Sequence, residues 1–511
     1  MAATVREVET KFEPTGDGGI PDLTALDGIA SVAGPETQEL DATYFDTEGL
    51  ALGAAGLTLR RRTGGSDAGW HLKVPVPGGG RDEIREPLGG SSADLVPDSL
   101  TTAVRLYTRG QGLDVVARLR TRRRAYLLSD ADGRTVAELS DDLVTVGTPA
   151  RPDGAGTAGW REWEVELVDG DEALLKAVGE VLEESGARPA PGPSKLARAL
   201  GDRIPRAPVD SGRTPGPQSS AADVVGSYLR RQLAELKYRD LFARLDEPDA
   251  VHKLRVANRR LRSALASYRP MMDRARTEPL RDELKWIAGI LGGARDAEVM
   301  RERLGGLIAD EPSELVMGPV AQRVEHQLGA AYRLAHQRAV EAMESSRYYT
   351  LIDDLDALVS DPPWTGRARD LAVDVLPARV AKTFERLRRR VIAATDAPDR
   401  QAQDDRLHEV RKAARRARYA AELLVPVVGR DAQRFAKATK RLQSVLGEHQ
   451  DAAVTQPALR QLAVQAHLDG DNAFTYGRLH ARQEALAADL RARFSDAWER
   501  VNRKKCRRWL P

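Results

Sequence analysis

Residues 6–12 read REVETKF, and this stretch sets the pattern for the first two hundred residues. If it forms a strand, alternate side chains share a face, so Glu7, Glu9 and Lys11 point the same way. Buried charges are costly unless they are paired or bound to a metal. Taken by itself, the stretch fits an edge strand with a solvated face. A charged cavity becomes the better interpretation if other strands repeat the pattern.

Other candidate strands in the first 203 residues do repeat this alternation of charge. Residues that share a strand face are Arg60 with Arg62, Arg81 with Glu83 and Arg85, and Glu162 with Glu164 and Glu166. The predicted strands span 4–12, 37–46, 57–63, 69–75, 81–88, 115–128, 134–147 and 159–168, with helices over 21–32 and 171–185. Turn residues separate these segments, which favours an antiparallel sheet or barrel. A sandwich with one wet face would explain part of the alternation, whereas a barrel with a charged lumen would explain all of it.

The two signs of charge together indicate a particular ligand. Arg and Lys bind phosphate oxygens, Arg through a planar fork and Lys as a point charge. Clustered carboxylates repel one another unless a divalent cation lies among them, and Mg²⁺ binds through a few carboxylates, waters and substrate phosphates. The sequence therefore predicts a site for a metal-bound polyphosphoryl group.

In their order along the chain, these residues resemble CYTH domains, which are also called triphosphate tunnel metalloenzymes. The resemblance covers nearly all of residues 1–203. The residues that carry it are Glu7, Glu9, Lys11, Arg60, Arg62, Lys73, Glu83, Asp142, Glu164, Glu166 and Lys195, with an arginine within 121–124. It implies an α+β domain, built on a closed antiparallel barrel, that hydrolyses or cyclises triphosphate substrates with Mg²⁺ or Mn²⁺.

The resemblance also implies a role for each side chain. The expected metal ligands are Glu7, Glu9, Glu83, Asp142, Glu164 and Glu166. The expected phosphate-binding residues are Lys11, Arg60, Arg62, Lys73, Arg123 and Lys195, and Glu7, Glu9 and Lys11 are the expected catalytic residues. Strand parity leaves two choices open, namely Arg122 or Arg123 and Asp141 or Asp142. The attacking group would be a metal-activated water, deprotonated by Lys11 or by a carboxylate.

A change of composition marks the domain boundary. Residues 202–220 read DRIPRAPVDSGRTPGPQSS, which is typical of a linker. We expect a first domain over 1–203, a linker over 204–217 and a helical domain over 218–506. The helices are predicted over 219–245, 248–269, 273–291, 294–309, 313–346, 348–359, 367–395, 403–425, 430–446, 450–468 and 471–504. Long helices with short joins suggest antiparallel bundles.

The helical half contains an internal repeat. The segment AVHKLRVANRRLRSALASYRPMM at 250–272 recurs as RLHEVRKAARRARYAAELLVPVV at 406–428. The match resumes with ILGGARD at 290–296 against VLGEHQD at 445–451, so two bundles of related sequence are expected. We expect these second blocks to turn the helices tightly, with Asp296 and Asp451 as caps or arginine partners.

Each copy of the repeat places a histidine and basic residues at +3, +7 and +10 on one helix face. A row of like charges destabilises a helix, and a single row would fit a solvated face with acidic partners from neighbouring helices. Two equivalent rows favour a basic channel for an extended polyanion. These residues resemble the CHAD domain, which implies binding of inorganic polyphosphate in a groove between two pseudo-symmetric bundles. The residues carried over are His252, Arg255, Arg259, Arg262, His408, Arg411, Arg415 and Arg418, with Lys253, Arg260, Lys412 and Arg416 as second choices.

Composition narrows the function further. The net charge of +2 argues against a general nucleic-acid binder, and the single cysteine, Cys506, excludes intrachain disulfides. There is no apolar run of membrane-spanning length and no signal-peptide pattern, so we expect no membrane partner and a cytoplasmic location, with association with polyphosphate granules as an option. The basic tail at 503–508 is expected to fray and to contact polyanions non-specifically.

The sequence as a whole predicts metal-dependent hydrolysis of inorganic triphosphate or polyphosphate, with the polyphosphate chain held by the helical domain. Three alternatives stay open. The protein could bind polyphosphate without catalysis, it could hydrolyse nucleoside triphosphates or cyclise ATP, or its arginine-rich helices could bind RNA or DNA.

Overall fold

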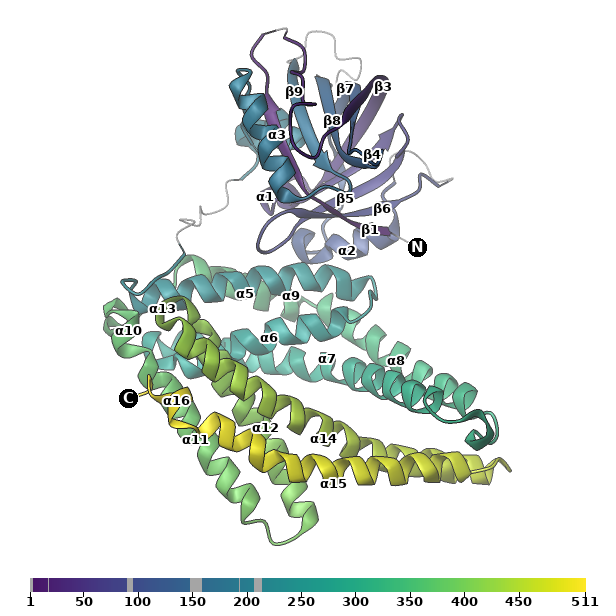
Figure 1. The fold of residues 1–511 in the computed structure, drawn as a ribbon, viewed down its shortest axis with the longest axis vertical. Coiled ribbons are helices and arrows are strands. Elements are labelled where there is room, and N and C mark those ends of the chain that lie inside the picture. The colour runs from purple at the N-terminus through teal and green to yellow at the C-terminus, as the bar shows by residue number, and fades with distance from the viewer. Residues whose placement is uncertain (1–2, 17, 90–94, 148–158, 193, 206–213) are drawn as a thin grey trace. The chain divides into compact units, whose positions relative to one another are not determined.

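A computed structural model describes residues 3–16, 18–89, 95–147, 159–192, 194–205 and 214–511. The chain divides into two compact units, Met1–Val209 and Asp210–Pro511, which we describe separately. The first unit combines an antiparallel sheet with short helices, and the second is helical (Figure 1). Residues 206–213 of the expected linker lie outside the described residues.

The first unit contains one ten-stranded sheet in which every pairing is antiparallel. Its strands are β1 (Ala3–Glu7), β2 (Glu9–Glu13), β3 (Ser31–Asp46), β4 (Thr58–Thr63), β5 (Gly69–Pro75), β6 (Arg81–Glu86), β7 (Asp114–Ser129), β8 (Thr135–Gly147), β9 (Gly159–Leu167) and β10 (Arg188–Pro189). Their order across the sheet is β1-β6-β5-β4-β3-β7-β8-β9-β2-β10. The eight expected strand regions are all present, and the first of them is split at Val8 into β1 and β2.

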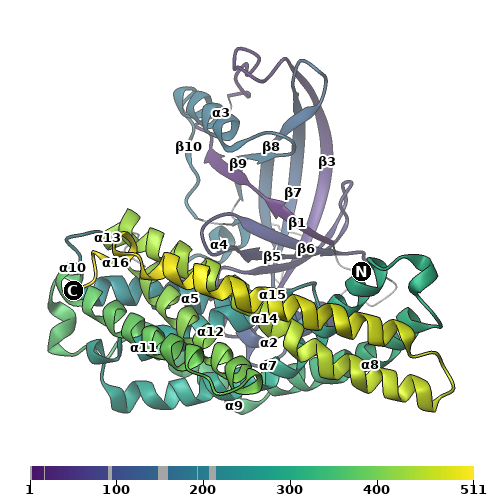
Figure 2. The same cartoon turned by 60° about the horizontal axis from the view of Figure 1, so that its bottom comes forward.

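The expected closed barrel is not confirmed. β1 pairs with β6 at one end of the sheet (Figure 2), whereas β2 pairs with β9 near the other end. Only Val8 separates β1 from β2, so the opening stretch of the chain connects the two ends of the sheet covalently. In the described part of the chain, however, no ladder of hydrogen bonds joins those ends, and hydrogen bonding therefore does not close the sheet.

The helices of this unit differ from expectation in two places. They are α1 (Ala51–Ala54), α2 (Asp98–Thr108), α3 (Glu172–Glu184) and α4 (Lys195–Leu200). The expected helix over 21–32 is wrong, because turns occupy 24–28 and β3 begins at Ser31. Its apolar residues Leu23 and Ile29 instead pack into the core beside α3, so their burial does not require a helix. The sequence interpretation missed α1 and α2.

The two faces of the sheet have different surroundings. One face packs Phe12, Trp163 and Val165 against Val178 and Leu182 of α3 in an apolar core. On the other face, α4 packs its Leu196 and Leu200 against Ala42, Tyr44 and Leu119. Ser194 caps α4 by accepting a hydrogen bond from the Ala197 amide. This cap fixes the start of the helix, and thereby the position of Lys195 on the second face. The charged site described below lies on the face that α4 covers.

The second unit is built from two sets of helices. The first set is α5 (Ala221–Arg244), α6 (Ala250–Ser267), α7 (Arg274–Ala309) and α8 (Val320–Met343), followed by α9 (Ser346–Ser360) and α10 (Ala372–Val375). The second set is α11 (Pro377–Thr395), α12 (Arg400–Leu423), α13 (Val425–Val428), α14 (Arg430–Leu468), α15 (Phe474–Asn502) and α16 (Lys504–Arg507). In each set the repeat helix, α6 or α12, packs between the helices before and after it, and α6 also contacts α12. The two related bundles therefore meet along the repeated segments.

The expected helix breaks near 292 and 447 are wrong. α7 runs through 36 residues and α14 through 39 without interruption. Glycine inside a helix costs about 1 kcal/mol relative to alanine, but tertiary packing can override that preference. Here the glycines lie under arginine side chains: Arg255 donates to the Gly292 carbonyl at 3.1 Å, and a β-carbon added at Gly447 would lie 3.5 Å from Arg411. Asp296 accepts from Arg255 at 3.4 Å, as an arginine partner and not as a cap.

No helix in the described ranges combines the length and the apolar character that crossing a bilayer requires.

Candidate functional site

A charged cavity lies on the sheet face that α4 covers. It encloses roughly 750 Å³ including its open mouth, and eight basic and six acidic side chains line it. All six expected phosphate-binding residues are among them, namely Lys11, Arg60, Arg62, Lys73, Arg123 and Lys195. Five of the expected metal ligands also line it, namely Glu7, Glu83, Asp142, Glu164 and Glu166, and Glu9 lies 3.2 Å from Lys11 beside them.

Strand register brings these residues together. Lys11 of β2 lies opposite Glu164 of β9, and Glu9 lies opposite Glu166. Asp142 of β8 lies opposite Arg123 on one side. Directly opposed residues of antiparallel strands share a face, so these pairs place side chains of both signs from β2, β9, β8 and β7 on one face of the sheet.

The same register settles the two choices that strand parity left open. Arg123 forms two 2.8 Å hydrogen bonds with Asp142 in the cavity. Arg122 lies on the opposite face with 64% of its side chain exposed, 3.7 Å from Glu39. Asp141 likewise pairs with Arg161 away from the cavity. Arg123 and Asp142 are therefore the members of each pair that belong to the site.

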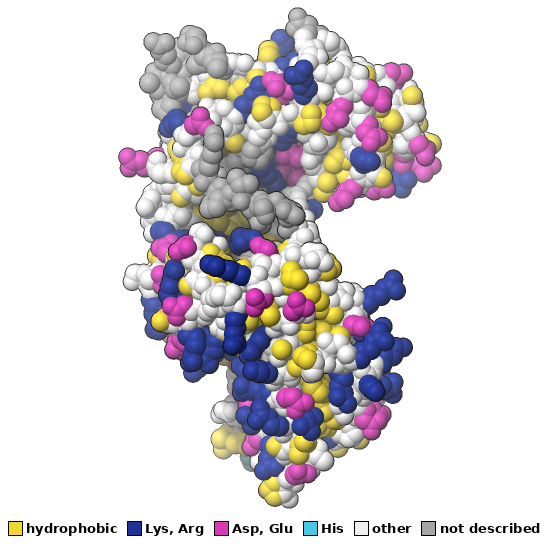
Figure 3. Space-filling view, turned by 90° about the vertical axis from the view of Figure 1, so that its left-hand side faces the viewer, with side chains coloured by type: hydrophobic (Ala, Val, Ile, Leu, Met, Phe, Trp, Pro, Cys, Tyr) yellow, Lys and Arg dark blue, Asp and Glu magenta, His cyan; other side chains and the backbone are white. Residues whose placement is uncertain are grey.

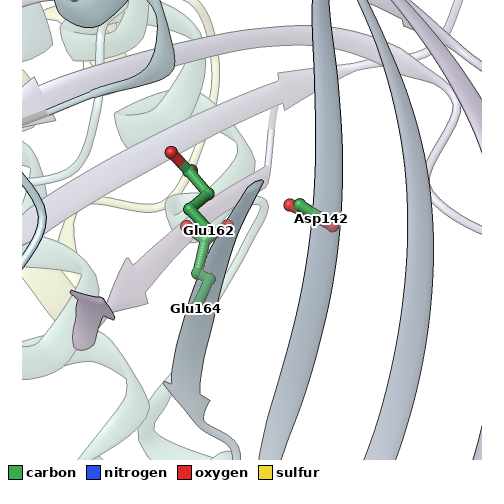
Figure 4. Close-up of side chains that lie close together, drawn as sticks. All are labelled: Asp142, Glu162 and Glu164. Atoms are coloured by element: carbon green, nitrogen blue, oxygen red, sulfur yellow. The ribbon is translucent and has the colours of Figure 1, made fainter. Parts of the chain in front are cut away.

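An acidic cluster next to the cavity brings three carboxylates close enough together to surround a cation. Oxygens of Asp142, Glu162 and Glu164 lie within 4.8 Å of one another, and Figure 4 shows Asp142 on β8 facing the two glutamates on β9. Glu162 was not among the expected ligands, although it shares a strand face with Glu164 and Glu166. The Lys195 ammonium already contacts all three carboxylates, at 3.0, 2.8 and 2.8 Å. A cation from α4 thus occupies the centre of this cluster.

The lysines and carboxylates in this cluster shift one another's pKa values. Burial alone would raise the pKa of Glu164, but Lys11 and Lys195 outweigh it and hold that pKa well below its usual range. Burial would likewise lower the pKa of Lys195, and Glu164, Asp142 and Glu162 together raise it well above the usual value. Asp142, whose pKa is also lowered, Glu164 and Lys195 are therefore ionised and paired with one another near neutral pH.

Replacing Lys195 tests this arrangement. Lys195→Met leaves three buried carboxylates without their central cation, and we expect the free energy of unfolding to fall by about 3–5 kcal/mol. Urea unfolding in the presence of a chelator measures this loss. Mn²⁺ should restore part of it in the variant, because the vacated cluster then offers carboxylate ligands. Lys176→Met on the exposed face of α3 is the matched control, and equal unfolding curves for the two variants would contradict the assignment.

The carboxylates on β1 and β2 lack a complete set of partners. Glu7 contacts Lys73 at 2.8 Å through one oxygen. The second oxygens of Glu7 and Glu9 are buried and accept no hydrogen bond from any described residue. Burial and the nearby Glu164 raise the pKa of Glu9 to about 7, and burial together with Glu7 raises the pKa of Glu166. A divalent cation binds to several carboxylate oxygens, and these unpaired oxygens on neighbouring carboxylates are suitable ligands for one.

Glu83 has a different environment from the other expected ligands. His71 lies 2.9 Å from it, Arg85 donates to it, and Arg60 and Lys73 lie at 3.9 and 4.0 Å. Burial would raise the pKa of Glu83, but His71, Lys73 and Arg60 hold it well below its usual range. Burial lowers the pKa of His71 to about 4, so this histidine is neutral near pH 7. His71 and Glu83 therefore position the neighbouring cations.

The cavity also contains unfilled hydrogen-bond donors. The Nε atoms of Arg60 and Arg62 are buried and have no acceptor among the described residues. Burial and the adjacent Arg60 lower the pKa of Arg62 to about 9, even though Arg62 also pairs with Asp67. Two crowded guanidinium groups with free donors are suited to anionic oxygens.

A separate basic groove lies in the helical unit between α6, α7 and α12. It encloses about 600 Å³ including its open side. Its lining is Arg259, Arg262, Ser263, Ala266, Arg281, Lys412, Arg415, Arg416 and Tyr419. Six of these residues are basic and, within the described ranges, none is acidic. The two repeats thus bring their arginine rows together at one place.

Only two of these six cations have an acidic partner among the described residues: Arg281 pairs with Glu278, and Lys412 lies 2.8 Å from Glu409. Burial and the nearby Arg259 lower the pKa of Arg415 to about 10, and burial, Arg259 and Arg281 lower that of Arg262. The Nε atoms of Arg259 and Arg281 are buried without an acceptor among the described residues. Arg259, Arg262, Arg415 and Arg416 have no acidic partner among the described residues, and such a partly buried group of cations is suited to a polyanion.

The remaining expected residues of the repeat do not line the groove. His252, Arg255, His408 and Arg411 lie farther along the same rows, and burial lowers the pKa of both histidines. Arg418 lies over the Tyr419 ring and 3.5 Å from Glu422. The second choices Lys412 and Arg416 do line the groove. Arg281 was missed, because it stands outside the repeated segments.

Family comparisons match both units. The family model of the CYTH domain matches residues 5–200, and that of the CHAD domain matches residues 227–460. The chain is a CYTH–CHAD protein. Two uncharacterized proteins of Mycobacterium tuberculosis, from strains CDC 1551 / Oshkosh and ATCC 25618 / H37Rv, are each 36% identical to it over 97% of this chain and 96% of their own. The two domains indicate a role that involves triphosphate or polyphosphate.

Solved structures are similar to parts of this chain. PptA from Streptomyces chartreusis is 28% identical over 55% of this chain and all of its own, with a TM-score of 0.46. The CHAD domain from the plant Ricinus communis is 24% identical over 57% of this chain and 96% of its own, with a TM-score of 0.43. The PH1819 protein from Pyrococcus horikoshii is 13% identical over 38% of this chain and 99% of its own, with a TM-score of 0.23.

Proposed function

We propose that the CYTH domain hydrolyses phosphoanhydride bonds of inorganic triphosphate and of polyphosphate ends, and that the CHAD domain binds the polyphosphate chain. One observation carries the proposal for the CYTH domain: buried acceptors on Glu7 and Glu9 and buried donors on Arg60 and Arg62 are unfilled among the described residues of one site. A ligand that fills both must bring anionic oxygens and a cation. A metal-bound polyphosphate does so.

Mg²⁺ or Mn²⁺ fits the carboxylates on β1, β2 and β9. We assign Glu7, Glu9 and Glu166 as the residues that would hold it, since the acidic cluster of Asp142, Glu162 and Glu164 already surrounds Lys195. When bound, such an ion supplies charge neutralisation at the phosphate and lowers the pKa of the attacking water.

The basic residues of the cavity would bind the phosphate groups of the substrate. Arg60 and Arg62 present free donors, and Lys73 and Arg123 extend the row of positive charge across the site. We assign removal of the water proton to a carboxylate and not to Lys11, because Glu164 raises the pKa of Lys11 against the effect of burial and keeps it protonated. Its ammonium instead stabilises the negative charge that develops on the phosphate oxygens as the anhydride bond breaks.

The CHAD groove would hold the rest of a long substrate. Its six basic side chains face no acidic residue among those that line it in the described structure. Because both domains belong to one chain, polyphosphate bound in the groove is presented to the cavity at a raised effective concentration. The groove should therefore matter for long chains and not for tripolyphosphate.

Phosphate release from tripolyphosphate tests the proposal. We expect the full chain to release phosphate in the presence of Mg²⁺ or Mn²⁺. Phosphate release should stop when the metal is chelated and resume when the metal is restored. ATP is assayed in parallel, and a clear preference for ATP would favour the nucleotide alternative. A folded protein that binds polyphosphate but hydrolyses neither compound would contradict the catalytic proposal and favour a binding role.

A further inference from the structure

A second basic surface lies at the C-terminal end of the helical unit. The residues that line it are Arg430, Gln433, Arg434, Lys437, Ala438, Arg441, Arg500, Arg503, Lys505 and Cys506, and we call it the C-terminal basic site. It shares no lining residue with the groove between α6 and α12. Figure 3 faces the side of the molecule on which the C-terminus lies in Figure 1, and many Lys and Arg side chains gather there on the helical unit. Arg500, Arg503 and Lys505 lie beyond residue 460, where the match to the CHAD family ends.

The charge of this site has one sign. Seven of its lining residues are basic and, within the part of the chain that the structure describes, none is acidic. Arg430, Arg434, Lys437 and Arg441 recur along α14 at helical spacing, so they form one row on one face. Of the seven, only Arg434 has an acidic partner among the described residues, Asp431 at 2.7 Å. Like charges on one helix face repel, and little in the protein offsets that repulsion here.

The C-terminal tail is folded onto α14, contrary to the expectation that it frays. The Trp509 ring packs edge-on against Phe435 with centroids 6.1 Å apart, and Cys506 is buried. Arg508 donates to Asp431 at 3.2 Å. These contacts anchor the tail and hold Arg503 and Lys505 beside the cationic row of α14, although electrostatics alone would keep them apart.

We propose that the C-terminal basic site is a second binding site for inorganic polyphosphate on the same CHAD domain. The choice of ligand rests on the proposed function. Polyphosphate offers only anionic acceptor oxygens, and apart from Gln433 the polar side chains that line the site carry only cationic donors. No aromatic side chain is among its described lining residues, so nucleic-acid bases would find no stacking surface there. A long chain that engages both sites gains affinity from the second contact.

Binding of long-chain polyphosphate to the full chain tests the proposal. Lys437→Gln/Arg441→Gln removes two exposed charges from the C-terminal basic site, and Arg500→Gln/Arg503→Gln does so independently from the other side. We expect each double variant to lose affinity roughly tenfold, since charge-assisted contacts are worth at least that much. Arg333→Gln/Arg338→Gln on the exposed surface of α8 removes the same charge and is the control.

A combined variant separates this proposal from the proposed groove. In a background of Arg259→Gln/Arg415→Gln, residual polyphosphate binding that Lys437→Gln/Arg441→Gln then removes supports two sites. Loss of all binding from the groove variant alone overturns the second site and leaves the proposed function intact. Affinity equal to the control in both C-terminal variants also overturns it. A wild-type protein that binds single-stranded oligonucleotide in preference to polyphosphate overturns both proposals.

Discussion

Replacing Glu7 and Glu9 together with glutamine should abolish metal-dependent phosphate release, with kcat falling by about a thousandfold or more. Glutamine keeps the shape of each side chain and removes the two carboxylates whose second oxygens are buried without a partner among the described residues. A divalent cation would lose two ligands, while Arg60 and Arg62 would still bind the phosphate. We therefore expect substrate binding to weaken much less than turnover. Steady-state kinetics with tripolyphosphate at several Mn²⁺ concentrations would separate the two effects.

The fold should survive this double change. Lys73 loses Glu7 but keeps Glu83 at 4.0 Å, and neutralising Glu9 removes its repulsion with Glu164. Circular dichroism should therefore show a cooperative melting transition for the variant. Glu39→Gln is the matched control, because Glu39 is 75% exposed on the opposite face of the sheet. If the folded double variant kept full activity, the metal would belong to the acidic cluster of Asp142, Glu162 and Glu164.

The chemistry of the CYTH site was predictable because strand alternation is a local property. REVETKF already places Glu7, Glu9 and Lys11 on one face, and the same period groups Arg60 with Arg62 and Glu164 with Glu166. The pairing of those charges was not predictable. It depends on the register of β2, β8 and β9 and on where α4 docks, and only tertiary structure specifies both. Lys195, Asp142 and Glu164 were expected in one site, but their direct contacts and the part that Glu162 takes in them could not be predicted from the sequence.

The errors have a common physical origin. Glycine positions and apolar periodicity indicate the local preference for a helix or a turn, but side-chain burial decides which secondary structure forms. A helix was expected over 21–32, but Leu23 and Ile29 are buried on either side of turns instead. Gly292 and Gly447 suggested helix breaks and instead admit arginine side chains against a continuous helix. The basic tail at 503–508 suggested fraying by charge, whereas Trp509 and Cys506 determine its position. The internal repeat was predictable, since two similar segments of sequence occur in the chain.

Replacing the equivalent arginines of the two repeats should strongly weaken polyphosphate binding. Arg259→Gln/Arg415→Gln should weaken binding of long-chain polyphosphate by about a hundredfold, because each lost contact is a charge-assisted hydrogen bond to phosphate. Arg259 and Arg415 occupy equivalent positions in the two repeats, and both line the groove. Titration of labelled polyphosphate at fixed salt would measure the loss. The salt dependence of binding should also become shallower, since fewer counterions are released.

The same variant should be at least as stable as the wild type. The pKa of Arg415 is lowered to about 10 by burial and by Arg259, so the two guanidinium groups oppose one another in the folded state. Removing both charges relieves that repulsion, and urea unfolding should show no loss of stability. Hydrolysis of tripolyphosphate should be unchanged, because the short substrate needs only the CYTH cavity. Hydrolysis of long chains at low concentration should fall with the binding. Loss of tripolyphosphate hydrolysis, or an equal loss of binding in Arg333→Gln/Arg338→Gln, would contradict the assignment of the groove.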